Sequence, residues 1–199
     1  MNNIQQNFSE SKKERILQAA EYIFGRENYA SATISQIAKR ANVAVGTVYE
    51  YFESKETLFF SIASEKCEIF DQELRLHLAG IVNVFEKIRK YVWLYFYYFQ
   101  SEPMYSELLL LNMRVNKNFR GSPAYVWIQK SVGEIITVIE EGQREGLIIT
   151  DVDAYTMRHM ILGSLEHITT RWLLHGKDYD LLEYSEKISN LIIRALRRD

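Results

Sequence analysis

The chain contains one cysteine, Cys67, among its 199 residues, and only two prolines, Pro103 and Pro123. A single cysteine excludes an intramolecular disulfide and any metal cluster built on several thiolates. The scarcity of proline leaves long stretches in which helices can run without a break. We predict that Cys67 is a small packing residue of a helix, with a redox sensor as the alternative.

The sequence also has no long apolar run. The densest one, YVWLYFYYF from Tyr91 to Phe99, is far shorter than the roughly 20 residues that cross a membrane as a helix. The first 15 residues contain no apolar segment of the kind found in secretion signals. We therefore expect a cytoplasmic protein with no membrane partner.

The sequence has no large excess of positive or negative charge. The chain has 24 Lys and Arg against 26 Asp and Glu, a formal net charge of −2. Residues 1–60 carry seven basic and seven acidic side chains. No global field attracts nucleic acid, so any DNA binding must come from local placement of side chains.

Apolar residues recur at helical spacing along almost the whole chain. This pattern predicts an all-α fold of about nine helices. We expect a three-helix helix-turn-helix module in residues 1–53, a connecting helix in 54–72, and a larger helical domain for ligand binding and dimerisation in 73–199. The helical segments predicted in this larger domain are Val82 to Gln100, Met104 to Asn116, Pro123 to Arg144, Asp153 to His175 and Tyr179 to Arg197.

The N-terminal module has clear helix start and turn signals. A first helix is predicted from Lys12 to about Phe24 on its apolar periodicity. Thr33-Ile34-Ser35-Gln36 matches a capping box at the start of a second helix. Asn42 can take the left-handed conformation of a tight turn, and a third helix follows from Val45. Such a pair of short helices is typical of a helix-turn-helix.

The third helix is predicted to bury Val48 and Phe52, which leaves its opposite arc for DNA. A recognition helix presents its first residues to base edges while neighbouring side chains hold phosphates. Small residues at its start allow a close approach, and hydroxyls on its flanks can reach phosphate oxygens. The residues in question are Val45, Gly46, Thr47, Tyr49 and Tyr51.

Lys55 adds an independent clue, because Ser54 is placed to cap a fourth helix that begins there. A cation in the first turn of a helix opposes the macrodipole at a cost of about 0.3–1 kcal/mol. An adjacent phosphate would reverse this cost, and the alternative is a solvated lysine whose stem covers apolar surface. We expect Glu50 at the solvated edge, and Lys39 and Arg40 in solvent.

The stretch from Arg15 to Phe59 resembles the DNA-binding domain of the TetR/AcrR family of bacterial transcriptional regulators. The pattern Gly46-Thr47-x-Tyr49-x-x-Phe52-x-x-Lys55-Glu56-x-Leu58 carries much of this resemblance. The chain departs from the family at Asn28 and Asn42, where Gly is frequent and a positive φ is expected. The resemblance implies operator phosphate contacts by Thr33, Thr47, Tyr49, Tyr51 and Lys55, and base contacts by Val45 and Gly46.

The resemblance further implies a homodimer, formed through the helices at 153–175 and 179–197, that binds double-stranded operator DNA. It also implies a small apolar effector that releases a repressor from that DNA, with the fourth helix as the lever. Aromatic and methionine side chains adapt well to apolar ligands. Our candidates for the effector pocket are Tyr95, Phe99, Met113, Arg114, Trp127, Met160 and His167.

The C-terminal stretch is similar to a subgroup of TetR-like repressors that control fatty-acid degradation and respond to long-chain acyl-CoA. Gly163, Trp172 and Tyr179-Asp180-Leu181 carry this similarity. Drug-like and quinone-like ligands suit the same composition. The residues alone leave open the operator, the regulated genes, and whether the regulator represses or activates.

Two other classes of function are alternatives. A small-molecule enzyme would use Glu166 and His167 as acid and base, but the sequence has no nucleophile elbow, phosphate loop or HExxH motif. A DNA-binding protein without an effector is the second alternative. His159, His167 and His175 lack the i, i+4 spacing of helical zinc sites, so we predict no metal, no cofactor and no catalytic residue.

Overall fold

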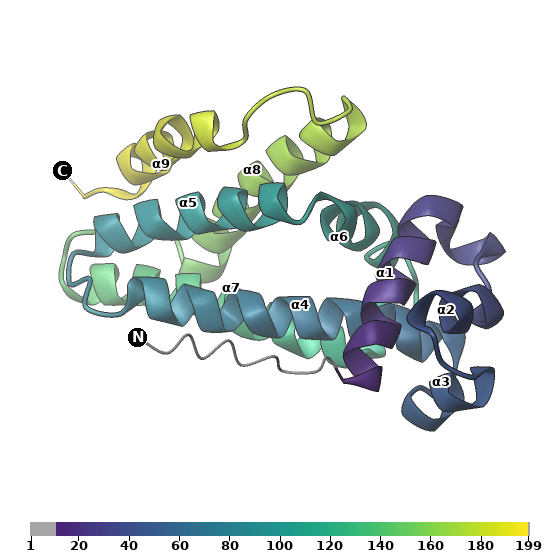
Figure 1. Ribbon diagram of the computed structural model, residues 1–199. Coiled ribbons are helices and arrows are strands. Elements are labelled where there is room, and N and C mark those ends of the chain that lie inside the picture. The colour runs from purple at the N-terminus through teal and green to yellow at the C-terminus, as the bar shows by residue number, and fades with distance from the viewer. Residues whose placement is uncertain (1–10, 199) are drawn as a thin grey trace, which may run out of the picture. The chain divides into compact units, whose positions relative to one another are not determined.

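A computed structural model describes residues 11–198 (Figure 1). In this part of the chain the structure is helical, with no strand beyond an isolated bridge between Ile148 and Arg197, and the predicted all-α fold is confirmed. No helix among the described residues is long and apolar enough to cross a membrane. The helices are α1 (Lys12–Ser31), α2 (Ile34–Ala41), α3 (Val45–Tyr51), α4 (Lys55–Leu78), α5 (Val84–Ser101), α6 (Pro103–Glu107), η1 (Leu108–Met113), η2 (Phe119–Gly121), α7 (Pro123–Arg144), α8 (Ala154–Leu174) and α9 (Leu182–Leu196).

The chain forms two compact units, one ending at Ile62 and the other beginning at Ala63. Helix α4 starts in the first unit and continues into the second, and it ends at Leu78. At its start, the Ser54 hydroxyl accepts a hydrogen bond from the Thr57 amide at 3.0 Å, which is the predicted cap.

Helix α1 begins at a capping box formed by Ser11 and Glu14. Its predicted end near Phe24 is wrong, because the helix continues through Gly25 and breaks only at Asn28 (φ 61°, ψ 163°). The Asn28 carboxamide oxygen accepts hydrogen bonds from the amides of Ala30 and Ser31 at 3.0 and 3.2 Å. Asn28 thus supplies local acceptors for the residues after the break, whereas Gly25 tolerates the helical conformation.

Helices α2 and α3 follow the sequence signals closely. Thr33 and Gln36 form the predicted capping box at the start of α2. Asn42 is left-handed (φ 53°, ψ 52°), and the Val43 amide that follows it donates to the Ala38 carbonyl at 3.0 Å. This arrangement satisfies the last carbonyls of α2 and turns the chain into α3.

In the second unit, α5 packs against α7, α8 and α9. The helix predicted from Met104 to Asn116 is not continuous, since α6 passes into a π-helix at Leu108–Met113. Its wide turn is marked by the Arg114 amide, which donates to the Leu109 carbonyl five residues earlier at 3.1 Å. The Asn112 side chain donates to the Glu107 carbonyl at 3.2 Å. π-Turns of this kind are frequent at functional sites.

The turn at Asn42 gives a direct test. Asn42→Ala should lower the free energy of unfolding by about 1 kcal/mol, because a Cβ without a local hydrogen-bonding group is strained in the left-handed region. Asn42→Gly should stay within a few tenths of a kcal/mol of the parent. Urea unfolding followed by circular dichroism measures both, and equal losses for the two variants would contradict the assignment.

Candidate DNA-binding surface and effector cavity

Helix α3 buries one side and exposes large side chains on the other. Val48 and Phe52 are fully buried, as predicted. Val45, Tyr49 and Tyr51 are 43%, 52% and 46% exposed. These fractions are high for rings and branched chains that have an available core, so this surface has the features of a binding surface.

The remaining DNA-contact candidates lie in the same unit. A Cβ added at Gly46 would meet no heavy atom within 4 Å, so the start of α3 is open to close approach by another molecule. Thr47 is half-buried and Thr33 is exposed. The Thr33 hydroxyl is engaged at the start of α2 with the Gln36 side chain and backbone. Contact of these residues with DNA stays a prediction.

The Lys55 ammonium has partners that the sequence did not indicate. It donates to the carbonyls of Ala32 and Ala30 at 2.9 and 3.4 Å and lies 4.6 Å from the centre of the Tyr29 ring. These carbonyls follow the break in α1, where backbone acceptors lack helical donors. They offset the unfavourable placement of a cation at the start of α4. Because an ammonium has three donors, one N–H is left for a phosphate.

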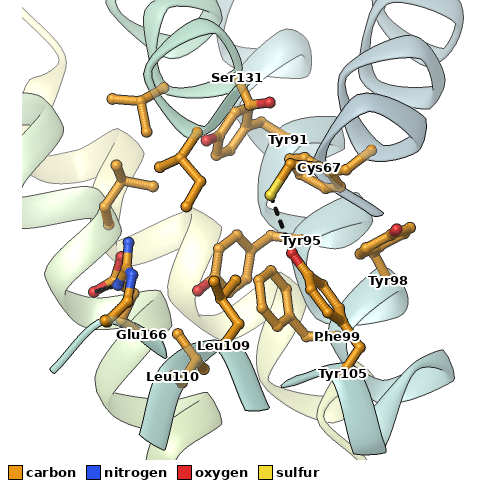
Figure 2. A pocket seen from close by; sticks show the side chains of 15 residues that line it. Cys67, Tyr91, Tyr95, Tyr98, Phe99, Tyr105, Leu109, Leu110, Ser131 and Glu166 are labelled. Carbon is orange, nitrogen blue, oxygen red and sulfur yellow. Dashed lines mark hydrogen bonds and ion pairs between the residues drawn. The ribbon is translucent and has the colours of Figure 1, made fainter. Parts of the chain in front are cut away.

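The second unit contains an apolar cavity between α4, α5, α6, η1, α7 and α8 (Figure 2). The space free of protein atoms in the cavity and at its open side is about 490 Å³, of which about 50 Å³ can be reached by the centre of a water molecule. The cavity is therefore narrow in this conformation. Its lining is Cys67, Phe70, Tyr91, Tyr95, Tyr98, Phe99, Tyr105, Leu109, Leu110, Arg114, Ile128, Ser131, Val132, Leu162 and Glu166.

The cavity has a polar edge formed by an ion pair. The Arg114 guanidinium contacts the Glu166 carboxylate at 2.5 Å, and both side chains are about one-third exposed. Glu166 holds the pKa of Arg114 above its usual value, against the effect of burial. The carboxylate thus offsets the cost of placing the Arg114 charge beside an apolar cavity.

A wider groove lies on the other side of this pair, between α7 and α8. It shares Ile128, Val132 and Leu162 with the cavity, besides the ion pair. Its own lining includes Gln129, Arg158 and His159. It also includes one glycine from each helix, Gly133 and Gly163, where an added Cβ would meet no heavy atom within 4 Å. The Arg158 Nε is buried without a hydrogen-bond partner. The site therefore joins an apolar interior to a polar, cationic exterior.

The structure brings three of the seven predicted pocket residues together, since Tyr95, Phe99 and Arg114 line the cavity. The other four lie outside both linings: Met113 is fully buried, Trp127 lies under Lys130 at 3.8 Å, and Met160 and His167 are exposed on α8.

Sequence reasoning missed the contributions of the other helices. Cys67 enters from α4 and Tyr105 from α6, and their side chains hydrogen-bond at 3.0 Å. The position of Tyr91 in the cavity lining could have been predicted, because Tyr91 precedes Tyr95 by one helical turn on the same face. No sequence pattern in α4 or α6 indicated which of their residues would line the cavity.

Helices α8 and α9 leave a set of apolar residues exposed on the second unit. The set is Tyr155, Met160, Leu174, Tyr184 and Leu191. Gly163 lies between Met160 and Leu174 with nothing within 4 Å of an added Cβ. Exposed apolar residues spread along two helices with a glycine among them are typical of a helix-packing interface.

The arrangement of Glu166 and His167 does not form an acid–base pair. Glu166 is engaged by Arg114 at the cavity edge, while His167 is exposed on the next position of α8. Among the residues that the structure describes, no three His, Cys, Asp or Glu side chains are grouped closely enough to hold a metal ion.

Comparison with known families covers nearly the whole chain. Residues 16–62 match the family described as "Bacterial regulatory proteins, tetR family", and residues 63–195 match "YsiA-like protein, C-terminal region". The fatty acid metabolism regulator protein of Bacillus subtilis (strain 168) is 24% identical over 190 residues, which cover 92% of this chain and 94% of that protein. The transcriptional repressor NicS of Pseudomonas putida is 28% identical over 209 residues, covering 94% and 92%.

Solved structures with a similar fold also belong to regulators. The fatty acid degradation regulator FadR from Bacillus halodurans has a TM-score of 0.86 and 27% identity, covering 94% of this chain and 97% of that one. FadR from Bacillus subtilis in complex with stearoyl-CoA also has a TM-score of 0.86, with 25% identity and coverage of 91% and 97%. The relatives compared are thus regulators of transcription or of fatty-acid metabolism.

The Cys67 thiol should be unreactive in the folded protein. Burial raises its pKa to about 11, although the hydrogen bond with Tyr105 and the charge of Arg114 act in the opposite direction. A raised pKa means that the nucleophilic thiolate forms only as the pH rises toward that value. At pH 8 we expect labelling by a disulfide reagent at least about two orders of magnitude slower than in urea-unfolded protein. Rapid native labelling would contradict this environment.

Proposed function

The chain belongs to the TetR family of bacterial regulatory proteins, and we propose that it is a homodimeric repressor released from its operator by a long-chain acyl-CoA. The observation that carries the effector is the apolar cavity, which shares Arg114 and Glu166 with a neighbouring groove that also holds Arg158. An acyl chain matches the interior, and a phosphorylated head group matches the groove. The stearoyl-CoA complex of a structural relative supports this choice.

DNA recognition is assigned to the exposed arc of α3 and to its neighbours. Val45 and Gly46 would lie against base edges, where a small side chain and a bare backbone allow close approach. The hydroxyls of Thr47, Tyr49 and Tyr51, with Thr33 and Lys55, would hold phosphates. Since the chain has no excess of positive charge, these local contacts must supply the affinity.

Dimerisation is assigned to the exposed apolar residues of α8 and α9, within the predicted helices 153–175 and 179–197. Burying Met160, Leu174, Tyr184 and Leu191 against their copies in a second chain would remove them from water. A two-fold dimer also presents two recognition helices to two half-sites, which compensates for the few base contacts of one module.

Coupling between ligand and DNA would arise from the narrowness of the cavity. A long acyl chain needs more room than the present conformation provides, so it binds better to a state in which the helices around the cavity have moved apart. Such a differential affinity is the source of any ligand-driven shift between states. Helix α4 lines the cavity through Cys67 and Phe70 and begins in the DNA-binding unit, so it is the proposed lever.

No catalytic role is proposed. Glu166 serves to neutralise Arg114 until the anionic head group of the effector approaches, and the exposed His167 has no cavity function.

The central test uses fluorescence anisotropy of labelled DNA from upstream of the gene, with a scrambled duplex at the same salt concentration. We expect specific binding that hexadecanoyl-CoA reverses in wild-type protein. Arg114→Met should need at least about tenfold more ligand, because the head group loses a charged hydrogen-bond donor. Lys177→Met, which removes an ion pair with Glu107 outside the cavity and the groove, is the matched control. Binding that acyl-CoA leaves unchanged would reject the effector and retain the regulator.

The phosphate role of Lys55 is tested by salt dependence. Lys55→Ala should weaken binding to every duplex and reduce the slope of log affinity against log salt concentration by about 1, since one phosphate contact is lost. Lys39→Ala, an exposed lysine on the same unit, should leave the slope unchanged. An unchanged slope for Lys55→Ala would mean that this lysine bonds to Ala30 and Ala32 and does not contact a phosphate.

A further inference from the structure

Four tyrosines line the cavity, and they fall into two pairs. The Tyr98 hydroxyl donates to the Lys66 carbonyl at 2.6 Å, and the Tyr105 hydroxyl is hydrogen-bonded to the Cys67 thiol at 3.0 Å. The hydroxyls of Tyr91 and Tyr95 form no hydrogen bond with any residue that the structure describes. Two phenols are therefore satisfied by the protein and two are not.

The unsatisfied pair is deeply buried, with Tyr91 1% and Tyr95 5% exposed. Buried tyrosine hydroxyls usually find a partner, so each exception calls for an explanation. The side-chain atoms that are enclosed without a partner are Arg15 Nε, Asp71 Oδ1 and Arg158 Nε, and neither hydroxyl is among them. Both hydroxyls consequently open onto the cavity rather than into packed protein.

Their positions define two points along the cavity. Tyr91 and Tyr95 lie one helical turn apart on the same face of α5, a spacing of about 5–6 Å between Cβ atoms. In Figure 2 the Tyr95 hydroxyl points toward the side where Glu166 lies, and Tyr91 lies farther along, toward Ser131. A ligand that enters past Arg114 and Glu166 would meet Tyr95 first and Tyr91 next.

Both groups are hydrogen-bond donors at neutral pH. Burial raises the pKa of Tyr91 and of Tyr95, and the negative charge of Glu166 raises both further. Each hydroxyl keeps its proton, so its natural complement is an acceptor oxygen on the ligand.

We propose that Tyr91 and Tyr95 select an acyl-CoA that carries a second oxygen on its chain, a 3-hydroxyacyl or 3-oxoacyl ester, over the saturated ester. Tyr95 donates to the thioester carbonyl oxygen, and Tyr91 donates to the oxygen on the third carbon. This inference rests on the acyl-CoA effector proposed above and assigns its chemical class. The regulator would thus sense partly oxidised chains, the products of a hydration or dehydrogenation step.

The reason for discrimination is the state of Tyr91 when a saturated chain is bound. A methylene chain would fill the cavity beside the hydroxyl, displace any water from it and leave the donor unpaired. A site built around a hydrogen bond rejects a ligand that lacks the matching group. Phenylalanine at the same position would remove this penalty, because it has no hydroxyl to satisfy.

The test is calorimetric titration of the full-length protein with hexadecanoyl-CoA and with 3-hydroxyhexadecanoyl-CoA. Wild-type protein should bind the hydroxylated ester about tenfold more tightly. In Tyr91→Phe the hydroxylated ester should bind about tenfold more weakly, while the saturated ester should bind as well as before or better, so the preference disappears. Tyr98→Phe removes a cavity phenol whose hydroxyl already has a protein partner, and it should keep the preference.

Thermal unfolding separates this role from a structural one. Tyr91→Phe should not lower the melting temperature, because its hydroxyl makes no hydrogen bond in the described structure, whereas Tyr98→Phe should lower it. Equal binding of the two esters by wild-type protein, or an equal loss for both in Tyr91→Phe, would overturn the inference and leave the acyl-CoA effector intact. If neither ester binds, the proposed effector fails and the inference fails with it.

Discussion

The burial of α5 is the constraint on which the second unit depends. The stretch Tyr91–Phe99 of this helix contains only apolar and aromatic residues, and ten side chains of the helix are buried, each worth about 1.5–3 kcal/mol. No single neighbour can cover such a surface, so α7, α8 and α9 pack around it. Aromatic rings stack only in a few geometries, such as the 4.5 Å stack of Tyr95 on Phe99. The cavity is the space that these rings and their neighbours leave unfilled.

The two units use aromatic side chains in opposite ways. In the first, the tyrosines of α3 are kept outside while Val48 and Phe52 form the core, so the surface gains rings without losing packing. In the second, the rings that line the cavity face inward, and the charged atoms of its lining are those of Arg114 and Glu166. Because the chain is nearly neutral, neither unit depends on a broad electrostatic field. The binding proposed at both places would therefore depend on short-range complementarity.

Local chemistry made much of the fold predictable from the sequence. The capping box at Thr33 and the left-handed Asn42 depend on neighbouring residues alone, and both were predicted correctly. Features that depend on distant residues were not accessible. The partners of Lys55 lie more than 20 positions earlier in the chain, and the cavity takes Cys67 from a helix with no distinguishing pattern. Within a stretch that is apolar on all sides, such as Tyr91–Phe99, periodicity cannot indicate which rings face a cavity and which face the core.

The π-helix at Leu108–Met113 bears on how this cavity can change in evolution. Its wide turn holds one residue more than an α-helical turn, and it lies directly before Arg114 in the cavity wall. Deleting one residue there would convert the wide turn into an ordinary α-helical turn, so the helix would stay continuous and Arg114 would keep roughly its present side, while the cavity wall lost one side chain. The wall of the cavity can therefore gain or lose a side chain by insertion or deletion of a single codon in this segment, a larger step than most substitutions provide.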